Sequence, residues 1–120
     1  MFRIVAVLRK RSDLSREEFL HLWRDQHPAY VRRLRGLRRY RQNPSIEHRK
    51  DWPFDGVAEL WFDSVRDIAV AYSGVEAEAL RAHEELFLDD MQWSIVEEDE
   101  IDLASEKPEA AAPADTRGES

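Results

Sequence analysis

His27 is the first side chain in the sequence whose position suggests proton transfer, because the apolar residues around it turn it inward. On a helical wheel it lies at the edge of an apolar stripe, one turn after Trp23 and one turn before Val31. Its imidazole is therefore predicted to face a sheet rather than bulk water, and a neutral imidazole there can exchange protons near neutral pH. The alternative is a structural histidine satisfied by a backbone carbonyl, for example one released by Pro28.

Glu59 is the second candidate, because it stands in the middle of the otherwise apolar run 56–62. An unpaired buried carboxylate is costly, so Glu59 must have a partner, reach solvent or line a cavity. If its face of the strand is covered by helices, Glu59 and His27 meet in one pocket and form an acid/base pair. The alternative is a carboxylate at a sheet edge or a dimer interface, paired with an arginine such as Arg39 or Arg41.

Three aromatic residues, Trp23, Tyr40 and Trp61, have the size and flatness to wall a cyclic ligand. Aromatic residues at these spacings are also typical of an ordinary hydrophobic core. The sequence leaves both interpretations open.

The motif content argues against several other chemistries. The four histidines show no H-x-x-x-H or H-x-H spacing and the chain has no cysteine, so no metal site is predicted. There is no G-x-S-x-G, Walker or G-x-G-x-x-G motif, which disfavours serine hydrolysis and phosphate-binding nucleotides. We therefore expect a protein without a cofactor.

The elements that position these residues follow from local patterns. Runs of β-branched and aromatic residues predict four strands, at 2–8, 37–43, 56–62 and from 93 to about 96. Ser15 and Glu18 have the spacing of a capping box, which predicts a helix that bends at Pro28 and ends at Gly36. Asp63 or Ser64 is predicted to cap a second helical region, in which helical spacing continues to residue 87 across an interruption at 73–74.

The resulting order, βαββαβ, predicts an α+β sandwich in which two helices cover one face of a four-stranded antiparallel sheet. The run 56–62 is apolar on both faces, yet the helices can cover only one of them. We therefore expect a homodimer in which two sheets pack face to face.

Charge is distributed unevenly along the chain. Residues 1–50 hold 14 basic and 5 acidic residues, whereas residues 51–120 hold 4 and 20. One interpretation is electrostatic pairing of the two halves within or between chains. The other is binding to nucleic acid or an acidic partner through six arginines of one segment, Arg32, Arg33, Arg35, Arg38, Arg39 and Arg41. The overall charge of −7 makes nucleic acid the less favoured partner.

The length of 120 residues and 42% hydrophobic content predict one small domain, residues 1–103. Residues 104–120 contain no large apolar side chain and are expected to form a disordered acidic tail. No apolar stretch is long enough for a membrane span, and no cleavage site follows the apolar start, so no membrane partner is expected. The absence of cysteine is compatible with a cytoplasmic protein.

Two segments together resemble a known family. The run EEFLHLWRDQHPAYVRRLRGLRRYRQN, followed by DGVAELWFDSVRDI, is similar to the EthD family of small ferredoxin-like proteins that form dimeric α+β barrels. The resemblance extends over about residues 2–100. It implies a homodimer with a pocket between helices and sheet. It also implies kinship with decarboxylases, dehydratases and lactone isomerases of cyclic or aromatic metabolites, and with proteins known only as companions of degradative oxidation pathways.

The same resemblance implies roles for individual residues. The family's helix histidine corresponds to His27 and its strand acid to Glu59. Its aromatic partner, strand tyrosine and strand asparagine correspond to Trp23, Tyr40 and Asn43.

Two functions remain for this chain. The first is a cofactor-free acid/base enzyme, a lyase or isomerase, in which His27 and Glu59 are catalytic and a cyclic or aromatic molecule is held by Trp23, Tyr40, Asn43 and Trp61. The second is a small-molecule-binding or accessory protein with the same pocket and no chemistry.

Overall fold

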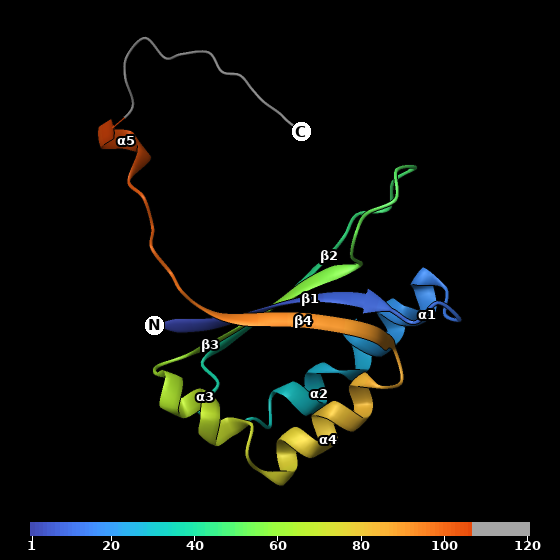
Figure 1. Cartoon of the computed structure of the whole chain (residues 1–120), viewed down its shortest axis with the longest axis horizontal. Coiled ribbons are helices and arrows are strands. Elements are labelled where there is room, and N and C mark those ends of the chain that lie inside the picture. The colour runs from blue at the N-terminus through green and yellow to red at the C-terminus, as the bar shows by residue number, and fades with distance from the viewer. Residues whose placement is uncertain (107–120) are drawn as a thin grey trace.

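The structure, a computed structural model, describes residues 1–106. Four strands form one antiparallel sheet in the order β2-β3-β1-β4 (Figure 1). Their bounds are Phe2–Lys10 for β1, Arg39–Pro44 for β2, Gly56–Phe62 for β3 and Leu88–Glu97 for β4. Helices α2, α3 and α4 lie on one side of this sheet (Figure 1). The predicted α+β fold, ferredoxin-like with helices on one face, is confirmed.

Each crossover between strands is broken into short helices. The first contains α1 (Arg16–Leu20), the π-helix η1 (His21–Gln26) and α2 (Pro28–Val31), and the second contains α3 (Val65–Ala71) and α4 (Val75–Glu84). The predicted capping box is confirmed, because the side chain of Ser15 accepts from the Glu18 backbone N–H and that of Glu18 accepts from Ser15. Ser64 is the N-cap of α3.

Two predicted boundaries are wrong. The first helical region ends at Val31, and the chain reverses through turns in which Gly36 adopts a positive φ of 78°. The last strand begins at Leu88 rather than at residue 93, because residues 88–92 pair with the end of β1. Their backbone is thereby satisfied, although Asp89, Asp90 and Gln92 carry no local strand signal.

The two faces of the sheet differ in composition and burial. Ile4, Ala58 and Leu60 point toward the helices and are at least 94% buried. Val5 and Val57 point to the other face and are half-buried, whereas helices α2, α3 and α4 of the described residues lie on the first face. The sequence prediction of one covered and one uncovered face therefore describes the single chain.

A further short helix, α5 (Leu103–Glu106), follows β4. It overlaps the first residues of the segment that is expected to be disordered from residue 104. The turn begins where the Asp102 side chain accepts from the Ala104 backbone N–H. The remainder of that predicted tail, 107–120, lies outside the described residues. No helix within residues 1–106 has the length and apolarity needed to cross a bilayer.

Candidate active site

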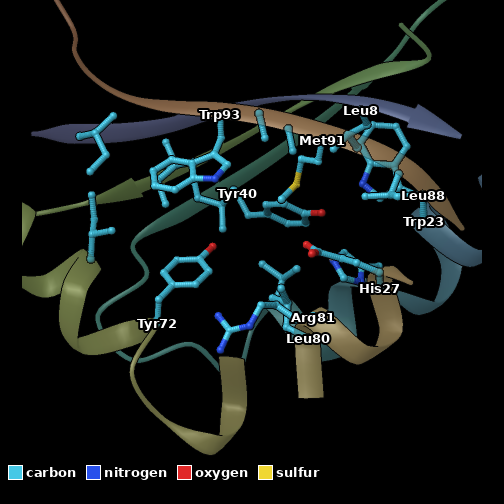
Figure 2. Close-up of a pocket in the computed structure, with 18 of the residues that line it drawn as sticks. Leu8, Trp23, His27, Tyr40, Tyr72, Leu80, Arg81, Leu88, Met91 and Trp93 are labelled. Carbon is cyan, nitrogen blue, oxygen red and sulfur yellow. The ribbon is translucent and has the colours of Figure 1, made fainter. Parts of the chain in front are cut away.

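A cavity of about 470 Å³ lies between the sheet and the helices (Figure 2). Its walls are mainly aliphatic and aromatic, which is typical of a small-molecule site. The apolar wall includes Ile4, Ala6, Leu60, Ile68, Leu80 and Met91. The polar or titratable side chains that reach it are His27, Tyr40, Tyr72, Arg81 and Glu84. The few polar groups can therefore orient a ligand that the apolar walls bury.

The π-helix η1 fixes the position of His27. Pro28 has no N–H, and the backbone N–H of His27 donates to the Leu22 carbonyl five residues earlier, at 2.9 Å. The carbonyl of Trp23 consequently lacks a donor from its own helix, and the side chain of Gln42 supplies one at 2.7 Å. The Trp23 carbonyl, which Pro28 leaves without an N–H donor, is thus bound by Gln42 of β2 and not by His27. The alternative prediction, in which His27 bonds to this carbonyl, is therefore wrong.

His27 is 4% exposed and is one of the residues that line the cavity. Its Nδ1 lies 2.8 Å from Nδ1 of His83, and its Nε2 lies 3.6 Å from Oε2 of Glu84. One of the two Nδ1 atoms must donate and the other accept, so this contact holds a single proton between the two rings. Glu84 thus stands on the opposite side of the His27 ring from His83, beside the cavity.

His83 supports His27 from the protein side. Its ring lies nearly parallel to that of His27, with centroids 5.0 Å apart, and stacks on that of Tyr30, with centroids 4.3 Å apart. Burial lowers the pKa of His83, and the neighbouring His27 lowers it further, whereas Glu84 acts in the opposite direction. His83 is therefore neutral at pH 7, so one of its ring nitrogens is free to accept a hydrogen bond.

We expect His83 to make the folded protein sensitive to acid. Because its folded pKa lies below the ordinary value of 6.5, the unfolded chain binds this proton more readily, and stability falls as the pH drops below 6.5. Thermal unfolding between pH 8 and pH 5 should therefore show a shallower loss of Tm for His83→Asn than for the unmodified protein. Parallel curves for the two proteins would contradict this, since every other titrating group is shared.

Two tyrosines present hydroxyl groups to the cavity. Burial raises the pKa of Tyr40 to about 12, although hydrogen bonds from Gln42 and Trp23 act in the opposite direction. Burial also raises the pKa of Tyr72, and the charge of Glu84 adds to the effect. Both hydroxyls therefore remain protonated at neutral pH and are available as hydrogen-bond donors.

The structure brings together three of the six residues selected from the sequence. His27, Trp23 and Tyr40 all line the cavity. Trp23 is 1% exposed and stacks on Phe19 with centroids 5.4 Å apart, so it is both core and cavity wall. Trp23 is thus a core residue that also lines the cavity, and its contact with a ligand stays a prediction.

The other three lie on the opposite face of the sheet. Glu59 forms a salt bridge of 3.0 Å with Arg3 and accepts from Asn43 at 3.1 Å. Trp61 has the guanidinium groups of Arg3 and Arg39 above its ring, at 5.3 and 4.7 Å. The pairing of Glu59 with His27 is therefore wrong, and so is the placing of Asn43 and Trp61 in the same pocket.

Glu59 lies on the uncovered face because successive side chains of a strand point to opposite faces of the sheet. Ala58, Leu60 and Phe62 are the larger continuous apolar set and are buried under the helices, so Glu59 must point away from them. The alternative prediction, a carboxylate paired with an arginine on the uncovered face, describes Glu59, with Arg3 as the partner.

Sequence reasoning missed Glu84, Tyr72 and Arg81. Arg81 and Glu84 are three residues apart on α4, and with Leu80 they form the helix face toward the cavity. The i, i+3 spacing was visible, but charged residues at that spacing usually face solvent. Only the tertiary packing of α4 beside α2 shows which face is turned inward.

Four of the six arginines of 32–41 contact other side chains of the protein. Arg38 bonds to Asp63 at 2.9 Å, Arg33 lies over Tyr30, and Arg39 and Arg41 lie over Trp61. Separately, within residues 1–106 no three histidine, aspartate or glutamate side chains are grouped so as to hold a metal ion.

Known proteins resemble this chain in sequence and in fold. The model of the EthD domain matches residues 11–91. Among solved structures, an EthD family protein from Bacillus halodurans is 19% identical, with a TM-score of 0.71 and coverage of 82% of this chain and 99% of the other.

A dimeric ferredoxin-like protein of unknown function from Thermobifida fusca is 12% identical, with a TM-score of 0.64 and coverage of 79% and 88%. A putative antibiotic biosynthesis monooxygenase from Nitrosomonas europaea is 17% identical, with a TM-score of 0.59 and coverage of 82% and 98%. No curated protein matches this chain. At these identities the structural matches establish the shared fold.

Proposed function

Because this chain belongs to the EthD family, we propose that it is a small acid/base enzyme that binds a cyclic or aromatic molecule in the cavity. His27 and Glu84 are the groups that move the proton, and Glu84 takes the place first given to Glu59. The observation that carries the proposal is the position of His27, between the neutral His83 and the carboxylate of Glu84, at the wall of a 470 Å³ cavity.

The chemistry follows from the pairing of an imidazole with a carboxylate. A C–H bond beside a ring carbonyl breaks, its electron pair forms the enolate, and the proton passes to the Glu84–His27 pair. Return of that proton to another ring carbon completes an isomerisation. Delivery to a departing hydroxyl, which leaves as water, completes a dehydration, and protonation of the carbanion left by loss of CO₂ completes a decarboxylation. The fold itself does not select one of these reactions.

The direct test is proton exchange from D₂O. Cyclic ketones and phenols such as 2-tetralone and resorcinol carry C–H bonds whose exchange is observed by proton NMR. We expect the protein to accelerate exchange of at least one such probe at neutral pH. Binding of these probes without any acceleration of exchange would overturn the enzymatic proposal and favour the second function, a small-molecule-binding or accessory protein.

The uncovered face of the sheet supports a homodimer. Val5, Val7 and Val57 form its apolar centre, beside the Arg3–Glu59 salt bridge. The related proteins from Thermobifida fusca and Bacteroides fragilis are described as dimeric. Pairing this face with its copy covers the valines in the manner expected for a two-fold interface.

Light scattering tests the dimer. We expect twice the chain mass of 14.1 kDa, and a monomer mass for Val57→Glu, because a charge would be buried between the sheets. Val70→Glu is the matched control, since Val70 is 44% exposed on α3, on the helical side of the sheet. A monomer mass for the unmodified protein would remove the proposal.

A further inference from the structure

The cavity is lined by an arginine that forms no ion pair among residues 1–106. Arg81 lines it from α4, and Glu84 follows three residues later on the same helix. Among the residues that the structure describes, these two form no ion pair with each other, because Glu84 is directed to Nε2 of His27 at 3.6 Å. Within the same residues no other carboxylate lines the cavity, so the Arg81 guanidinium has no direct ion-pair partner there.

Two hydroxyl donors reach the same space. Figure 2 shows the Tyr72 hydroxyl and the Arg81 guanidinium directed into the cavity from the end opposite His27. Within residues 1–106 no hydrogen bond contributes to the environment of the Tyr72 hydroxyl. The Tyr40 oxygen accepts from Nε2 of Gln42 at 2.7 Å, which leaves its own proton free to donate. The cavity therefore offers a cation and two donors at positions where the protein supplies no acceptor.

This arrangement is complementary to an anion. Arg81 is an exposed residue that lines the cavity and Tyr72 is half-buried, so both can donate to a bound group, and a carboxylate offers several lone pairs for charge-assisted hydrogen bonds with them. The rest of the wall is apolar, and Trp93 of β4 is 58% exposed at the cavity, where it can cover a flat ring. A neutral apolar ligand would fill the space without forming hydrogen bonds with these three donors.

Building on the proposed function, we propose that the substrate is an aromatic or cyclic carboxylate, whose carboxylate binds Arg81 and Tyr72 while its ring reaches His27 and Glu84. The Arg81 guanidinium then offsets the repulsion between the negative charge of the ligand and Glu84, which follows one turn later on α4. Arg81 and Tyr72 are specificity-determining residues in this scheme, and they take no part in the proton transfer itself.

The test compares two probes of equal shape. 2-Naphthoate is an anion at pH 7, and 2-naphthamide is its neutral counterpart, so the ratio of their affinities reports recognition of the charge alone. We expect calorimetry to show 2-naphthoate binding about tenfold more tightly or better, as is typical for hydrogen bonds to a charged group. Arg81→Met should reduce the ratio to near one, and Tyr72→Phe should reduce it partially.

Arg24→Met is the matched control, because Arg24 is an exposed arginine of η1 outside the cavity. It removes the same formal charge and should leave the ratio unchanged. Circular dichroism of each variant verifies that it folds. Equal affinities for the two probes, no binding of either probe, or a ratio that survives Arg81→Met would overturn the inference.

These measurements separate the inference from the proposed function. His27→Gln should retain the preference for 2-naphthoate even where proton exchange is lost. If no probe exchanges in D₂O but the preference depends on Arg81, the anion site stands and the enzymatic proposal falls. If exchange occurs without any preference for the anion, the enzymatic proposal stands and the anion site falls.

Discussion

Substitution of His27 by glutamine should slow proton exchange of a bound probe by about 10²–10⁴-fold, the range typical for the loss of a general acid or base. Glutamine fills a similar volume and retains a hydrogen-bonding amide toward His83, but it does not take up a proton at neutral pH. Glu84 would then lose the imidazole that lies 3.6 Å from its carboxylate. The rate of H/D exchange under saturating probe measures the effect.

His21→Gln is the control for this substitution. His21 belongs to the same helical segment, but its side chain is 62% exposed and bonds to Asp25 rather than to a cavity residue. It should leave the exchange rate unchanged. Affinity for the probe should change little in His27→Gln, because the apolar walls remain in place. An exchange rate close to that of the unmodified protein, in a folded His27→Gln variant, would remove His27 from the mechanism.

The fold was predictable where local signals agree. The capping box at Ser15 and the strand at 56–62 depend on neighbouring residues only, and both are present in the structure. The orientation of His27 toward a sheet followed from the apolar stripe around it, and the ring does line the cavity. Its catalytic role remains a prediction.

The site was less predictable because its parts are distant in sequence. His83 lies 56 positions after His27, and no periodicity within one helix indicates that their rings stack. For Glu59 the difficulty was different. Both faces of its strand are apolar, so alternation alone did not reveal which one the helices cover. Only the pairing of β1 with β3 places Glu59 beside Arg3, and this salt bridge shows that Glu59 lies on the uncovered face.

Substitution of Gly56 by alanine should destabilise the protein by about 1–3 kcal/mol, the usual cost of overpacking a core. A Cβ at this position would lie 2.6 Å from both Cη2 and Cζ3 of Trp23. The indole cannot move away freely, because it is 1% exposed, stacks on Phe19, and belongs to a residue whose carbonyl is bound by Gln42. Chemical denaturation followed by circular dichroism measures the loss.

Because the new methyl group would clash with the indole of Trp23, the cost of Gly56→Ala should depend on the residue at position 23. Trp23→Phe removes the outer ring atoms that the new methyl group would meet, so Gly56→Ala should cost less in that background than in the unmodified protein. Gly74→Ala is the control, because its Cβ would meet only the flexible side-chain end of Glu76. If Gly56→Ala costs no more than Gly74→Ala, Trp23 is not held rigidly against β3. The cavity wall beside His27 would then be free to shift, contrary to the packing described above.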